Sequence, residues 1–171
     1  MWGSQMQDDD VAWEWSNINC IVDPQEDVGG LYLGNIEGAK LEVLRKHKIS
    51  AVLTVAAGTE LKYDKKDIPN HKIIDAEDWS AYDLSKHFDA ALEFIKEHIA
   101  KGNVYVHCFA GVSRSATIVI AHLMKEKKLP LKETIKYVKS KRSMISPNRG
   151  FLEQLEKYEA ILAIEAKIPE K

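Results

Sequence analysis

The sequence predicts an α/β fold, in which a central, largely parallel five-stranded sheet is flanked by helices on both faces. Short runs rich in Val, Ile and Leu alternate along the chain with longer segments whose apolar residues recur at helical spacing. No internal repeat or low-complexity linker interrupts this alternation. A chain of 171 residues is long enough for one domain with a proper core.

The predicted strands are short and rich in β-branched and other apolar residues, and a Gly-Gly pair turns the chain between the first two. They are 18–22, 31–33, 49–56, 73–74 and a run that begins at residue 104. Five segments carry amphipathic or buried helical spacing, and Pro130 stands just ahead of one of them as a helix starter. These predicted helices are 39–48, 84–99, 115–124, 131–141 and 151–166.

We expect an N-terminal segment (1–16) that is partly disordered, a folded domain (17–166) and a short C-terminal tail (167–171). The composition is ordinary for a soluble globular protein, with 45% hydrophobic and 29% charged residues. A formal net charge of -2 provides no overall basic field, and no apolar run is long enough to span a bilayer. We therefore expect neither nucleic acid nor a membrane as a partner.

One stretch, VYVHCFAGVSRS at residues 104–115, organises the rest of the chain. It reads as a buried strand, then a tight loop, then the start of a helix. Backbone N–H groups at a helix N-terminus converge on one spot, where the helix dipole favours an anion. Arg114 can curl back and offer two parallel N–H donors to phosphate oxygens. The same positive field favours the thiolate form of Cys108, so this loop combines a nucleophile with a phosphate-binding site.

The pattern His-Cys-x-x-Gly-x-Ser-Arg-Ser resembles the signature loop of the cysteine-dependent protein tyrosine phosphatases, and most of all their dual-specificity branch. The resemblance covers about residues 17–158, including LYLGN at 31–35. It implies a small dual-specificity phosphatase without a rhodanese-like docking domain. Such an enzyme hydrolyses phosphotyrosine and phosphoserine/threonine in proteins through a cysteinyl-phosphate. The expected partner is a phosphorylated protein, with a MAP kinase as one candidate.

The resemblance makes Cys108 the nucleophile and Arg114 the phosphate ligand. The departing oxygen needs a proton from a carboxylic acid on another loop, and Asp75 and Asp78 are the two candidates. An ungapped comparison with the family pattern places the acid on Asp78. The remaining substrate-binding positions are those of the loop itself, Phe109, Ala110, Gly111, Val112 and Ser113.

Three further residues have expected supporting roles. Ser115 is implied to donate a hydrogen bond to the sulfur, although capping of the helix is compatible with the same position. His107 is expected to orient the loop rather than act as a base. Asn148, within SPNRGF, matches the family position that braces the signature loop, and a helix cap is an equal alternative. The lysine-rich run from Lys125 to Arg149 is expected to be a solvated face, or more weakly a rim that attracts acidic phosphorylated segments.

We expect no metal and no cofactor. The chain has no His-x-x-x-His or Cys-x-x-Cys spacing and no nucleotide-binding Gly-x4-Gly-Lys-Ser/Thr pattern. Its two cysteines, Cys20 and Cys108, do not form a disulfide framework. A required thiolate argues for a reducing compartment, so the expected location is the cytoplasm, with the nucleus as a second location.

Two other classes of function are alternatives to this prediction. A phosphoinositide or RNA 5′-triphosphate phosphatase of the same superfamily is disfavoured, because loop positions Phe109, Ala110 and Val112 are uncharged and the chain lacks a basic field. The candidate acid Asp78 also counts against an RNA triphosphatase. A non-catalytic phosphoprotein-binding module is the second alternative. Such modules usually lose the nucleophile or the arginine, and this chain keeps both.

Overall fold

A single mixed sheet lies at the centre of the computed structural model, which describes residues 17–169. The predicted N-terminal segment (1–16) therefore lies outside the described residues. The strand order is β1-β2-β5-β3-β4, and only the β1–β2 pair is antiparallel. The largely parallel five-stranded sheet is thus confirmed. Its strands are β1 (Ile18–Val22), β2 (Leu31–Gly34), β3 (Ile49–Val55), β4 (Asn70–Ile74) and β5 (Asn103–His107).

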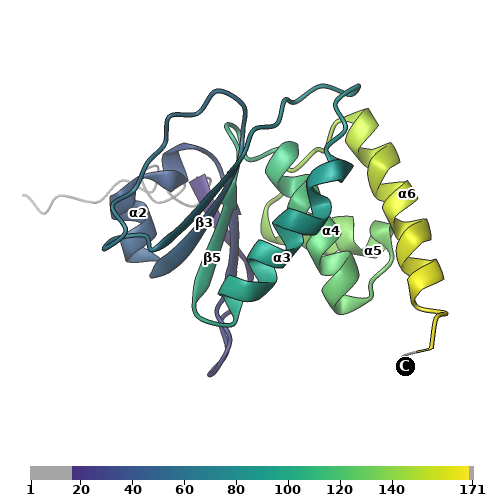
Figure 1. Ribbon diagram of the computed structural model, residues 1–171, viewed down its shortest axis with the longest axis horizontal. Helices are drawn as coiled ribbons and strands as arrows, with labels where there is room; N and C mark the ends of the chain where they lie inside the picture. Colours follow the sequence, from purple (N-terminus) through teal and green to yellow (C-terminus); the bar gives the residue numbers. More distant parts are fainter. Residues whose placement is uncertain (1–16, 170–171) are drawn as a thin grey trace, which may run out of the picture.

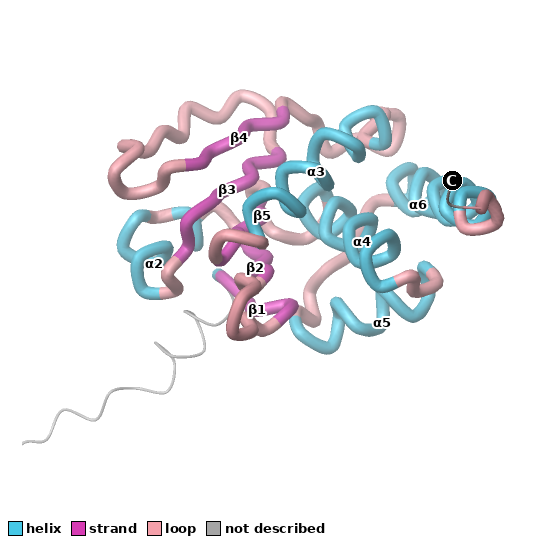
Figure 2. Tube along the Cα trace, turned by 60° about the horizontal axis from the view of Figure 1, so that its bottom comes forward, coloured by secondary structure: helices cyan, strands magenta, loops and turns pink. Residues whose placement is uncertain are grey.

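Helices cover both faces of the sheet, as predicted (Figures 1 and 2). Four helices lie on one face, and the short helix α2 with the 3₁₀ turn η1 lies on the other. A second 3₁₀ turn, η2, leads directly into α3. The bounds are η1 (Glu37–Ala39), α2 (Leu41–Lys46), η2 (Ser85–His87), α3 (Phe88–Ile99), α4 (Arg114–Lys127), α5 (Leu131–Lys141) and α6 (Arg149–Glu165).

The position of β5 at the centre of the sheet explains why its sequence is apolar without interruption. Val104 and Val106 belong to the larger core, under α3 and α4, whereas Tyr105 belongs to the smaller core beside α2. Side chains of a strand alternate between the two faces of its sheet, and here both faces are covered. Every residue from Val104 to His107 is therefore buried.

Helix α4 is surrounded by α3, α5, α6 and the sheet. All ten residues from Ser115 to Met124 are buried, as expected for a helix that is apolar on every side. Because Arg114 is the first residue of this helix, the packing of α4 fixes where the end of the preceding loop lies.

Most predicted elements differ from the structure by a few residues at their ends, and three differ for a clear structural reason. The segment 39–48 is not one helix, because the backbone of Lys40 is extended (φ -65°, ψ 138°) and separates η1 from α2. The segment 84–99 begins with the 3₁₀ turn η2 before α3. Strand β4 starts at Asn70 rather than residue 73, because its polar first half pairs in register with β3. Among residues 17–169, no helix is long and apolar enough to cross a membrane.

Candidate active site

The signature loop (residues 108–113) joins β5 to α4 at the carboxyl end of the central strand. Ligands of open α/β sheets bind outside the carboxyl ends of parallel strands. The neighbouring strands β2 and β3 both run parallel to β5, so their carboxyl ends face the same side as the loop. The strand-loop-helix arrangement that the chemistry requires is therefore present.

The sulfur of Cys108 accepts two hydrogen bonds. The hydroxyl of Ser115 donates one over 3.0 Å, and the backbone N–H of Gly111 donates the other over 3.2 Å. Cys108 and Ser115 are both buried, so neither bond competes with bulk water. Hydrogen-bond donors directed at sulfur favour the thiolate over the thiol. The contact expected between Ser115 and the sulfur is present.

Gly111 is required where the loop turns beneath the cysteine. Its backbone has φ +68°, a left-handed conformation that other residues adopt only with strain. A Cβ atom built on it would also lie 2.5 Å from the backbone of Gly34. Conformation and lack of space both exclude a side chain, in agreement with its expected role in shaping the loop.

Arg114 links the signature loop to a second loop. Its Nη1 donates a hydrogen bond to the carbonyl oxygen of Ala76 over 3.0 Å. Its Nε is buried and has no hydrogen-bond partner among residues 17–169. Buried N–H groups are rarely left unpaired without a functional reason. An unpaired arginine N–H next to this loop is a donor that a phosphate oxygen can take.

The two candidate acids have different surroundings within the acid loop (residues 75–84). The carboxylate of Asp75 accepts a hydrogen bond from the backbone N–H of Gly58 over 3.2 Å, so it closes a neighbouring turn. The carboxylate of Asp78 accepts one from Nδ2 of Asn148 over 2.9 Å. The backbone N–H of Asn148 in turn donates to the hydroxyl of Ser113 over 3.0 Å. Only Asp78 is tied in this way to the signature loop.

Asn148 fulfils both of the roles that its sequence position left open. Its Oδ1 accepts a hydrogen bond from the N–H of Phe151 over 2.9 Å, which caps the N-terminus of α6. Its backbone N–H contacts Ser113 of the signature loop, and its Nδ2 contacts Asp78. One residue at the start of α6 therefore contacts both loops, the signature loop through its backbone N–H and Asp78 through its side chain.

His107 is held by hydrogen bonds at both ring nitrogens and by stacking on the ring of Tyr105. Its Nδ1 lies 2.9 Å from the carbonyl oxygen of Cys108, and its Nε2 lies 2.7 Å from the hydroxyl of Thr54. Burial lowers the pKa of His107 to about 4, so the ring is neutral near pH 7. A carbonyl only accepts, so Nδ1 carries the proton and Thr54 donates to Nε2. Thr54 can then accept from Nε2 of His71, 2.9 Å away.

Comparison with known proteins identifies the family. Residues 31–161 match the family described as dual specificity phosphatase, catalytic domain. The chain belongs to this family. The match covers both loops and the start of α6, so the residues described above lie inside the dual-specificity phosphatase domain.

Relatives from distant organisms support this assignment to the family. Over 140 residues the chain is 40% identical to MAP kinase phosphatase with leucine-rich repeats protein 3 of Dictyostelium discoideum, covering 81% of this chain and 16% of that protein. Over 137 residues it is 39% identical to dual specificity protein phosphatase 1 of Arabidopsis thaliana, covering 79% of this chain and 68% of that protein. The chain thus spans only a small part of some of its relatives.

A solved structure supports the fold. A mouse putative dual specificity phosphatase, crystallised with zinc tungstate, superposes with a TM-score of 0.79 at 24% identity. The alignment covers 100% of this chain and 99% of that one. The α/β architecture is therefore that of dual-specificity phosphatases.

The dual-specificity phosphatase domain also contains a site residue that the sequence did not indicate. Arg142 is 1% exposed, so the expectation of a solvated face was wrong for this member of the basic run. Its Nε donates to the carbonyl oxygen of Gly111 over 2.9 Å, and its Nη1 donates to Oδ1 of Asn19 over 2.8 Å. No local sequence signal separates Arg142 from its exposed lysine neighbours, because its partners lie 31 and 123 residues away.

One exposed aromatic ring lies in the signature loop and another in the acid loop. Phe109 is 67% exposed and Trp79 is 65% exposed, and each directly follows a candidate catalytic residue. Ala110 is also exposed and Val112 is half-buried. The loop residues that surround the sulfur therefore present an apolar, uncharged rim, as their sequence predicted.

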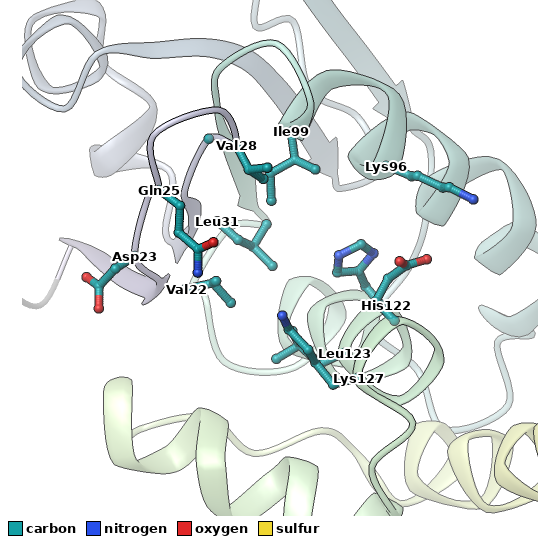
Figure 3. Close-up of a pocket in the computed structure, with 12 residues that line it drawn as sticks. Val22, Asp23, Gln25, Val28, Leu31, Lys96, Ile99, His122, Leu123 and Lys127 are labelled. Atoms are coloured by element: carbon teal, nitrogen blue, oxygen red, sulfur yellow. The ribbon is translucent and has the colours of Figure 1, made fainter.

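A cavity of about 230 Å³ lies elsewhere in the dual-specificity phosphatase domain, and Figure 3 shows the residues around it. It is formed by the segment after β1 and by the C-terminal halves of α3 and α4, with Leu31, Ile99 and His122 among its lining residues. None of the predicted site residues lines it. Across the described part of the chain, no group of His, Cys, Asp and Glu side chains is arranged to hold a metal ion.

Proposed function

We propose that this chain is an active protein phosphatase that hydrolyses phosphotyrosine and phosphoserine/threonine monoesters, with Cys108 as the nucleophile. One arrangement supports this above all others. The sulfur of Cys108 accepts hydrogen bonds from Ser115 and Gly111, and directly after this loop Arg114 has a buried Nε–H without a partner among residues 17–169. A nucleophile and a phosphate ligand are thereby held in one short segment.

In the first step, the Cys108 thiolate attacks phosphorus on the side opposite the ester oxygen. The P–S bond forms as the P–O bond breaks, and Asp78 gives its proton to the departing oxygen. Arg114 and the backbone N–H groups of the loop bind the three remaining phosphate oxygens, where negative charge is concentrated.

In the second step, water hydrolyses the cysteinyl-phosphate. The Asp78 carboxylate takes a proton from the water as its oxygen attacks phosphorus, and the P–S bond breaks. The hydroxyl of Ser115 and the N–H of Gly111 stabilise the departing thiolate. The products are inorganic phosphate and the dephosphorylated protein.

A MAP kinase is the proposed protein substrate, and the cytoplasm, with the nucleus as a second location, the proposed compartment. The name of the Dictyostelium relative supports the first point, since that protein is called a MAP kinase phosphatase. The exposed rings of Phe109 and Trp79, next to Cys108 and Asp78 in the sequence, support the use of phosphotyrosine, because exposed aromatic rings can pack against the ring of such a substrate. A buried nucleophilic thiol supports a reducing compartment.

The proposal is tested by turnover of p-nitrophenyl phosphate and of a peptide phosphorylated on both Thr and Tyr. The wild-type chain should release phosphate from both, Cys108→Ser should abolish release, and Arg114→Lys should severely reduce it, because an ammonium cannot replace the two-pronged guanidinium. Cys20→Ser is the matched control and should behave as the wild type. A wild-type chain that binds the peptide without turnover would instead be a binding module.

A further inference from the structure

The acid loop (residues 75–84) has little burial of its own to hold it in place. Within it, only Ala76 and the last residue, Leu84, are buried. The remaining residues are exposed, apart from the half-buried Tyr82. A loop with so few apolar contacts depends on hydrogen bonds and close backbone contacts for a defined position. Those contacts determine where the carboxylate of Asp78 lies.

The N-terminal turns of α6 supply several of these contacts (Figure 1). Asn148, the cap of this helix, holds the carboxylate of Asp78. Gly150 lies against the backbone of Ser80, so closely that a Cβ atom at this position would overlap the Ser80 carbonyl group and lie 2.8 Å from its Cα. The backbone two residues beyond Asp78 therefore rests directly on the helix.

Gln154 holds the far end of the same loop. Its Oε1 accepts hydrogen bonds from the backbone N–H groups of Leu84 and Ser85, each over 2.9 Å. Its Nε2 donates to the carbonyl oxygen of Tyr82 over 2.8 Å. The two N–H groups lie at the start of η2, and the Leu84 N–H also lies 3.1 Å from the carbonyl oxygen of Tyr82.

We propose that Gly150 and Gln154 are positioning residues for Asp78, a role that rests on the proposed function of Asp78 as the general acid. Positions 148, 150 and 154 are separated by fixed rises along one rigid helix. Their three contacts at Asp78, Ser80 and residues 82–85 therefore set the course of the acid loop. Gly150 is needed because only a residue without a side chain lets the loop approach this closely.

The test compares two aryl phosphates that differ in their need for a proton. Phenyl phosphate has a poor leaving group and needs the acid, whereas 2,4-dinitrophenyl phosphate needs it little. A correctly placed general acid contributes about 10²–10⁴-fold, so Gly150→Ala should lower kcat/KM for phenyl phosphate by about tenfold or more. The rate with 2,4-dinitrophenyl phosphate should stay near that of the wild type.

A double variant shows whether Gly150 acts through Asp78. Asp78→Asn should show the same selective loss, and adding Gly150→Ala to it should cost nothing further. Gly102→Ala is the matched control. A Cβ there would meet only the side chain of Ser50 within 4 Å, at the end of β5 remote from the signature loop, so both substrates should be unaffected.

Gln154 provides a second, independent variant. Gln154→Leu removes all three hydrogen bonds and should reproduce the selective loss, whereas Gln154→Glu keeps the Oε1 acceptor and should recover part of the rate. If Asp78→Asn is selective but Gly150→Ala and Gln154→Leu affect both substrates equally, or neither, the positioning role is overturned. If Asp78→Asn itself shows no selectivity, it is the assignment of the acid that fails.

Discussion

The guanidinium of Arg142 donates from Nε to the carbonyl oxygen of Gly111 over 2.9 Å, beneath the loop that holds Cys108. Its Nη2 also lies 3.4 Å from the carbonyl oxygen of Ala110. That carbonyl belongs to the same peptide unit as the Gly111 N–H that contacts the sulfur. The buried guanidinium of Arg142 therefore holds the backbone of the signature loop at Ala110 and Gly111. It also adds positive charge near the thiolate.

We expect Arg142→Met to slow the alkylation of Cys108 by iodoacetamide at neutral pH, because the thiolate loses both a nearby charge and a fixed N–H donor. The carbonyl groups left unpaired should also reduce the free energy of unfolding by about 1–3 kcal/mol. Alkylation rates followed by mass spectrometry, with urea denaturation, measure both effects. The exposed Lys139→Met is the control. Equal alkylation rates in Arg142→Met and the wild type would contradict this role.

The assignment of the acid to Asp78 predicts a particular pH dependence. General-acid catalysis needs a protonated acid together with an ionised nucleophile, so kcat/KM should be bell-shaped in pH. Asp78→Asn should lose the basic limb and about 10²–10⁴-fold in rate on phosphotyrosine. Asp75→Asn should keep that limb, because its carboxylate is engaged with Gly58. If Asp75→Asn flattens the limb and Asp78→Asn does not, the acid lies three residues earlier.

Peroxide should inactivate the enzyme through a sulfenic acid at Cys108 and not through a disulfide with Cys20. Cys20 pairs with Tyr32, and Tyr32 pairs with Tyr105. The two cysteines are thus separated by two strand spacings of about 5 Å and by three residues of about 3.3 Å each along the strands. Disulfides require Cα atoms within about 7 Å. Peptide mapping after mild oxidation should find no Cys20–Cys108 bridge.

Acid should destabilise the fold through buried histidines. Burial lowers the pKa of His122, beside the cavity in Figure 3, to about 4. In the unfolded chain this group titrates near 6.5, so the unfolded state takes up a proton first as the pH falls. Stability is therefore lost from about pH 6.5 downwards. His122→Gln should reduce the loss between pH 7 and pH 5 by about 2 kcal/mol in urea denaturation.

His107 should contribute to the same acid sensitivity, since burial lowers its pKa to about 4 as well. The His122→Gln variant should therefore retain part of the wild-type loss. An unchanged loss in this variant would mean that His122 titrates alike in the folded and unfolded states.

The sequence predicted what depends on local pattern. A continuous apolar run predicted the buried strand β5, and the Cys-containing loop with Arg114 followed from its place before a helix. The structure showed those roles of side chains that depend on partners far away in the sequence. Thr54 acquires its role from His107, 53 residues away, and Gln154 acts on a loop about 70 residues earlier. No periodicity or short motif carries such pairings, which exist only once the chain is folded.

The burial of α4 from Ser115 to Met124 has a consequence for how this domain can be redesigned. The residues that hold the nucleophile and the arginine are locked into the interior, whereas Phe109, Ala110 and Trp79 project into solvent. Exposed positions tolerate substitution with little change in stability. Libraries restricted to these three positions should therefore yield variants with new peptide preferences at almost unchanged melting temperature. In this domain, the residues that determine selectivity and the residues that determine folding are different sets.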